Sequence, residues 1–190
     1  MTEREKVSTE TPPFEKDPEV IKIFDEAVNV LKAGNVYGIK LNQKQTGKLM
    51  SGFVDEVVKK QREDAWLRTI NVEIEENKGT ITGTIGVKSY SWALFDMKCV
   101  LDNDGDSGLL KLSMLKISTE SGWRAKAALK IMNVEENTKN YLEDQKVQKP
   151  NINKVFKEYL NSQFKRRDPS VKADKLLLCF NKSTLSVKVK

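Results

Sequence analysis

The chain has 190 residues and a formal net charge of +6, and hydrophobic residues make up 38% of it against 32% charged residues. This balance supplies enough apolar side chains for one buried core, and it excludes a fully disordered chain. The sequence contains no histidine, so it lacks the most common proton-transfer group near neutral pH and the most common transition-metal ligand. We therefore expect a protein that is not an enzyme and that uses no cofactor and no metal.

The N-terminal region is polar and carries no apolar stretch of the kind that a signal peptide contains. No apolar run in the sequence reaches the roughly 20 residues that a membrane-spanning helix requires. We expect a cytoplasmic location if the sequence is full length, and a location in the cell envelope if an N-terminal signal or anchor was removed. Residues 1–16 predict a flexible tail because they are polar and aperiodic, and residues 17–190 predict a single domain.

Two amphipathic helices are predicted in the first third of the chain. The first begins at Asp17, whose carboxylate suits the N-cap position, and ends near Gly34. Residues 36–41 predict a short strand. Asn42, followed three residues later by Gln45, resembles a capping box, and the segment after it repeats apolar residues at intervals of three and four. This pattern predicts a second helix with one apolar face.

Beyond Trp66 the hydrophobic period changes from helical spacing to alternation, which is typical of strands. Residues 77–79 predict the turn of a hairpin. Residues 89–101 predict a third strand that is apolar on both faces, so we expect other elements to cover it on both sides. Residues 102–108 then predict a turn into a fourth strand at 109–117. Together these strands predict an antiparallel meander.

The segment 119–148 fits a helix and a strand equally well by periodicity. We favour a strand followed by a helix over residues 135–146. Apolar spacing then predicts an amphipathic helix over 152–164, and residues 171–189 predict a closing hairpin. The expected fold class is α+β: a curved antiparallel sheet, formed by the meander and the C-terminal hairpin, packed against two or three amphipathic helices.

An acidic, glycine-rich loop at residues 102–108 invites comparison with calcium-binding loops. The EF-hand pattern requires glycine at its sixth position and glutamate at its twelfth, and this chain has Ser107 and Ser113 there. Two interpretations stay open, an ordinary turn and a weak cation site.

Basic residues concentrate near the C-terminus: residues 149–190 contain eleven lysines and arginines against three acidic residues. Lys165, Arg166 and Arg167 form the densest cluster. They either complement the dipole at a solvated helix end or bind an anionic partner, which is a membrane surface or, as the weaker alternative, nucleic acid. No ladder of aromatic residues of the RNA-binding kind accompanies them.

The element order resembles that of single-domain bacterial members of the tubular lipid-binding (TULIP-like) superfamily. The resemblance covers residues 36–190 and includes the segment 39–49, the meander, the basic amphipathic helix and the final hairpin, which ends with residues 185–189. It implies a curved sheet that wraps a long helix and leaves an apolar groove for acyl chains. The residues that the resemblance would place along this groove are Phe53, Val57, Trp92, Leu94, Phe156 and Leu160. A fully packed core would bury the same apolar stripes without a groove.

The sequence supports two classes of function and leaves a third open. The first hypothesis is a non-enzymatic module that binds a lipid or another apolar small molecule between sheet and helices. The alternative is a module that binds nucleic acid or another anionic partner through Lys165, Arg166 and Arg167. A protein-interaction scaffold is the third.

Overall fold

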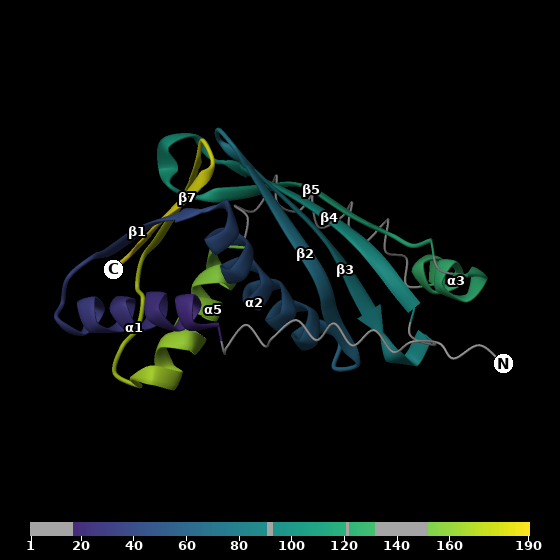
Figure 1. The fold of residues 1–190 in the computed structure, drawn as a ribbon, viewed down its shortest axis with the longest axis horizontal. Helices are drawn as coiled ribbons and strands as arrows, with labels where there is room; N and C mark the ends of the chain where they lie inside the picture. Colours follow the sequence, from purple (N-terminus) through teal and green to yellow (C-terminus); the bar gives the residue numbers. More distant parts are fainter. Residues whose placement is uncertain (1–16, 91–92, 121, 132–151) are drawn as a thin grey trace.

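The protein is described by a computed structural model that covers residues 17–90, 93–120, 122–131 and 152–190. Within these residues, four α-helices pack with two antiparallel β-sheets (Figure 1), so the predicted α+β class is confirmed. The helices are α1 (Pro18–Lys32), α2 (Gln43–Gln61), α3 (Trp123–Ile131) and α5 (Ile152–Arg167). The strands are β1 (Tyr37–Asn42), β2 (Ala65–Glu75), β3 (Lys78–Val87), β4 (Ala93–Asn103), β5 (Leu110–Ser118), β6 (Leu176–Asn181) and β7 (Thr184–Val189).

Side-chain caps fix the starts of α1 and α2, as the sequence predicts. The Asp17 carboxylate accepts hydrogen bonds from the backbone amides of Glu19 and Val20 at 3.0 and 3.4 Å. At α2, the amide of Gln45 donates to Asn42 Oδ1 at 2.9 Å and the amide of Asn42 donates to Gln45 Oε1 at 3.0 Å. These bonds satisfy amides that have no partner inside the helix.

The larger sheet is a meander with strand order β2-β3-β4-β5. The hairpin between β2 and β3 turns at Asn77, which adopts a positive φ of 63°. Alternation decides which side chains face the helices: Val72 and Ile74 on β2, and Ile81 on β3, are buried. The 3₁₀ turn Lys88–Tyr90 precedes β4, so this strand begins at Ala93 and not at residue 89 as predicted.

The C-terminal hairpin belongs to a separate, smaller sheet with strand order β1-β7-β6. Leu41 on β1 stands opposite Leu185 on β7, so the short N-terminal strand, and not the meander, is the hairpin's partner. The first hairpin strand begins at Leu176, five residues later than predicted. Figure 1 shows this sheet at one end of the larger one.

The strand that we predicted at the beginning of 119–148 is wrong, because residues 123–131 form the helix α3. Ala125 is 3% exposed and packs with Ala65, Val87 and Phe95 in a small hydrophobic cluster. Alanine is the strongest helix former, so the alanine-rich composition of this segment favours the helix once periodicity fails to decide. The helix that we predicted at 135–146 lies outside the described residues.

The main core joins α1, α2 and α5 to both sheets. Its centre is a group of aromatic side chains on the three helices: Phe24, Phe53, Phe156, Tyr159 and Phe164. The rings of Phe53 and Phe156 meet edge to face, with centroids 4.9 Å apart. Among the described residues, no helix combines the length and the apolar character needed to cross a bilayer.

Candidate functional site

Three of the side chains predicted to line an apolar groove lie together in the main core. Phe53, Phe156 and Leu160 are 6%, 2% and 3% exposed. Phe53 contacts both Phe156 and Tyr159 through its ring, so these aromatic groups pack against one another. Val57, one turn further along α2, is partly buried and packs against the same cluster.

The two remaining predicted residues come from β4 and the turn before it. Leu94 pairs with Gly86 and neighbours the buried Phe95, so alternation places Leu94 on the side of the sheet away from the helices. Trp92 lies outside the described residues. The structure therefore brings Phe53, Phe156 and Leu160 together and places Leu94 on the opposite face of the sheet.

A row of partly exposed apolar side chains crosses the helix-facing side of the larger sheet. Ile70, Gly83, Met97 and Ile117 stand opposite one another on the four strands. Leu67 and Ile85 form part of the adjacent row. We call Leu67, Ile70, Ile85, Met97 and Ile117 the apolar band, and all five are only partly buried. The band lies between the main core at one end of the sheet and the small cluster around Ala125 at the other.

Gly83 occupies the middle of the apolar band. A Cβ at this position would lie 2.6 Å from the carbonyl oxygen of Thr69, so the close approach of the two backbones requires glycine here. The register between β2 and β3 shifts between Leu67 and Thr69, which is a β-bulge at the same place. As a result, no side chain rises from the centre of the band.

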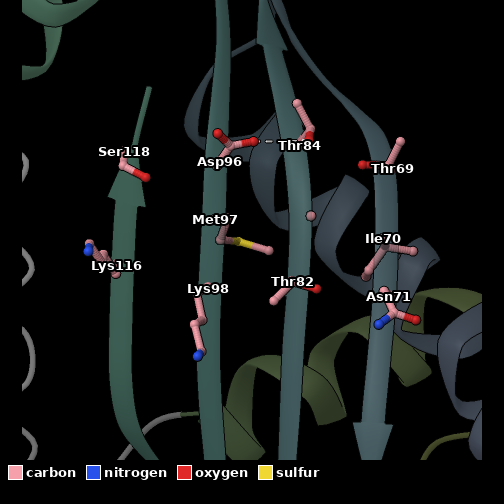
Figure 2. A pocket seen from close by; sticks show the side chains of 11 residues that line it. Thr69, Ile70, Asn71, Thr82, Thr84, Asp96, Met97, Lys98, Lys116 and Ser118 are labelled. Atoms are coloured by element: carbon pink, nitrogen blue, oxygen red, sulfur yellow. Dashed lines mark hydrogen bonds between the residues drawn. The ribbon is translucent and has the colours of Figure 1, made fainter. Parts of the chain in front are cut away.

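The opposite face of the same sheet carries a shallow pocket of about 440 Å³, which we call the outer-face pocket. Figure 2 looks onto this face, with the helices behind the strands. Two cross-strand rows of side chains form its walls: Thr69, Thr84, Asp96 and Ser118 in the first row, and Asn71, Thr82, Lys98 and Lys116 in the second. Its floor is the backbone of Ile70, Gly83 and Met97, the row whose side chains point to the other face.

Two lysines dominate the electrostatics of the outer-face pocket. Lys98 and Lys116 stand directly opposite each other on β4 and β5, and both are exposed. Among the described residues, neither ammonium group forms an ion pair within 4.0 Å. Among the lining residues that the structure describes, Asp96 alone has a carboxylate, which accepts a hydrogen bond from Thr84 Oγ1 at 3.3 Å. The pocket therefore carries a net positive charge.

The predicted basic cluster at the end of α5 is divided between structural and exposed positions. Arg167 pairs with Asp25 of α1 at 2.9 Å, and its guanidinium lies 4.9 Å from the centre of the Phe24 ring. Arg167 therefore stabilises the contact between α5 and α1. Lys165 and Arg166 are exposed. The prediction that Lys165, Arg166 and Arg167 bind an anionic partner stays a prediction.

The acidic loop at residues 102–108 forms a compact turn between β4 and β5. Its glycines Gly105 and Gly108 adopt positive φ angles of 54° and 68°, and a 3₁₀ turn covers Gly105–Ser107. The Ser107 hydroxyl donates to the carbonyl oxygen of Asp104 at 2.7 Å. Within the described residues, no group of three or more acidic or cysteine side chains is arranged to hold a metal ion.

The chain matches no protein-family model, and no curated protein matches it either. The apolar band and the outer-face pocket are therefore the features from which a function can be inferred. Sequence reasoning missed the pocket, because Lys98 and Lys116 are 18 positions apart and meet only through the register of β4 with β5. The signal that points to them is the alternation within each strand, which places both lysines on the outer face.

Proposed function

We propose that this protein is a binding module for a lipid or another apolar ligand, held against the apolar band on the helix-facing side of the larger sheet. The observation that supports the proposal is the partial exposure of this band. Well-packed interiors leave few apolar side chains of a central sheet in contact with solvent. Here five of them lie between two buried clusters, with Gly83 at the centre.

The free energy of binding would come mainly from the apolar surface of the ligand. Burial of one methylene group contributes about 0.8 kcal/mol, so ten methylenes of an acyl chain would contribute about 8 kcal/mol. That free energy corresponds to a dissociation constant in the micromolar range before the cost of ordering the chain is subtracted. An acyl chain of ordinary length is thus a suitable ligand for a band of this kind.

The chemistry next to the band favours binding over catalysis. Cys99 lies in the neighbouring row of β4, and burial raises the pKa of its thiol to about 12. The thiol therefore stays protonated near neutral pH, and a protonated thiol is a poor nucleophile. With no histidine in the sequence, a base to activate it would have to be a less common group.

The test compares two methionines on neighbouring strands. Met97 belongs to the band, whereas Met114 on β5 is 44% exposed and lies outside it. We expect the unaltered protein to bind a fluorescent fatty acid and to retain lipid in native mass spectrometry. Met97→Gln should weaken binding about tenfold, because it places an amide against the acyl chain. Met114→Gln is the matched control and should bind like the unaltered protein.

Circular dichroism of both variants separates loss of binding from loss of fold. If the unaltered protein takes up no fatty acid and retains no lipid, the proposed function is wrong. If both variants bind with unchanged affinity, a lipid site elsewhere on the protein replaces the one proposed here.

A further inference from the structure

We propose that the outer-face pocket is a second binding site, which takes the phosphate group of a hydroxyl-bearing phosphate ester between Lys98 and Lys116. The site lies on the side of the sheet opposite the apolar band, so it goes beyond the proposed lipid function and does not depend on it. Its volume of about 440 Å³ falls within the range of pockets that bind small molecules.

Two like charges stand next to each other in the outer-face pocket. Lys98 and Lys116 are direct cross-strand neighbours, an arrangement that destabilises a sheet when no opposite charge compensates it. No carboxylate of the described residues lies within 4.0 Å of either ammonium group. A phosphate bound between them would replace this repulsion with two charge-assisted hydrogen bonds.

Neutral hydrogen-bond donors complete the phosphate end of the pocket. Thr82 stands next to Lys98 on the adjacent strand, and Asn71 stands next to Thr82. A threonine hydroxyl and an asparagine amide can each donate to a phosphate oxygen. The row Asn71, Thr82, Lys98, Lys116 therefore presents donors on all four strands.

The first row of pocket side chains determines which kind of phosphate compound fits, and it consists of Thr69, Thr84, Asp96 and Ser118. Asp96 lies two residues before Lys98 on the same face of β4, and a carboxylate repels a phosphate but accepts hydrogen bonds from hydroxyl groups. Thr84 and Ser118 flank Asp96, and their hydroxyl groups can also form hydrogen bonds with the hydroxyls of a ligand. A ligand with a phosphate at one end and hydroxyls at the other matches both rows, whereas inorganic phosphate matches only one.

The experiment follows backbone amide shifts of the full chain by two-dimensional NMR during titration with glycerol 3-phosphate, inorganic phosphate and glycerol. We expect glycerol 3-phosphate to shift the amides of the pocket strands and to bind more tightly than inorganic phosphate. Lys98→Gln and Lys116→Gln should each weaken binding about tenfold, because each removes one charge-assisted bond. Lys111→Gln is the matched control: it removes the same charge from β5 outside the pocket and should leave the affinity unchanged.

Asp96→Asn provides a change of opposite sign. It removes the negative charge from the pocket, so we expect it to strengthen binding of inorganic phosphate and to reduce the preference for glycerol 3-phosphate. Leu67→Gln, which changes a side chain of the apolar band that does not line the pocket, should weaken fatty-acid binding and leave phosphate affinity unchanged. The two proposals can therefore fail separately.

A phosphate ester can also come from a lipid headgroup, and a vesicle experiment distinguishes this source. Binding to phosphatidylglycerol vesicles, whose headgroup carries a phosphate and free hydroxyls, that is lost in Lys98→Gln, together with weak binding of the soluble ester, assigns the site to a headgroup. The proposal is overturned if glycerol 3-phosphate causes no shifts in the pocket. It is also overturned if Lys111→Gln weakens binding as much as the pocket variants do, since the attraction would then be a general charge effect.

Discussion

Replacing Asn103 with alanine removes the side chain that joins the end of β4 to the edge of β6. Asn103 Oδ1 accepts a hydrogen bond from the amide of Phe180 at 2.8 Å, and Asn103 Nδ2 donates to the carbonyl oxygen of Phe180 at 2.9 Å. The carbonyl oxygen keeps a second bond, from the amide of Asn77 at 3.3 Å, but the amide of Phe180 loses its acceptor. A neutral hydrogen bond contributes about 1 kcal/mol, and a stranded buried amide costs about 1–3 kcal/mol. We expect the variant to lose about 2 kcal/mol of unfolding free energy.

Urea unfolding followed by circular dichroism measures this loss, which should lower the thermal midpoint by about 4–8 °C for a chain of this size. Asn103→Asp keeps the acceptor for Phe180 and loses the donor, so its effect should be about half as large. Asn181→Ala is the control, because its side chain bonds to Ser186 Oγ at an exposed site. A loss below about 0.5 kcal/mol in Asn103→Ala would show that the Asn103 side chain adds little to the apolar packing and the backbone hydrogen bonds that join the two sheets.

Three further predictions test individual features of the structure. Tyr37→Phe should raise the unfolding free energy, measured by urea unfolding, by up to about 1 kcal/mol, because the buried Tyr37 hydroxyl has no hydrogen-bond partner among the described residues. A large loss of unfolding free energy would instead show that the Tyr37 hydroxyl has a hydrogen-bond partner. Hydrogen bonds from Ser89 lower the pKa of Asp64 from 3.8 to about 2, so the stability that they contribute is present above pH 3.8 and is lost as pH falls towards 2. The urea midpoint of Asp64→Asn should therefore fall less than that of the unaltered protein between pH 5 and pH 2.5. Gly83→Ala should destabilise the fold by about 1–3 kcal/mol, because the added Cβ would meet a backbone oxygen. Gly38→Ala should change stability by less than about 1 kcal/mol, because the nearest atom to its added Cβ is a side-chain atom at 3.7 Å. Equal thermal midpoints for the two variants would contradict the close backbone approach at Gly83.

Local signals in the sequence predicted local structure. The caps at Asp17 and Asn42 and the hairpin turn at Asn77 depend on residues within a few positions of one another, so the relevant chemistry is visible in a short window. The helix α3 was missed because periodicity does not separate a short apolar helix from a strand. The deciding contact, between Ala125 and residues of the distant strands, is not a local property.

Long-range pairing explains the other differences between prediction and structure. The final hairpin was predicted, but its pairing with β1 joins segments more than 140 positions apart, and no local pattern specifies that choice. The contacts within the candidate site could not be predicted for the same reason, because they join residues far apart in the sequence. Phe53 and Phe156 were recognised as apolar residues on helices, yet only their contact in three dimensions shows that they fill the core.

The two proposed sites have a structural element in common. The backbone of Ile70, Gly83 and Met97 is the floor of the outer-face pocket, and the side chains of the same row belong to the apolar band. In a strand, successive side chains point to opposite faces, so one stretch of sheet can present apolar groups inward and charged groups outward without conflict. This arrangement predicts that changes confined to side chains affect one site only. A change to the shared backbone, such as Gly83→Ala, should weaken fatty-acid binding and phosphate-ester binding together, and an effect on only one of them would show that the two sites do not share this row.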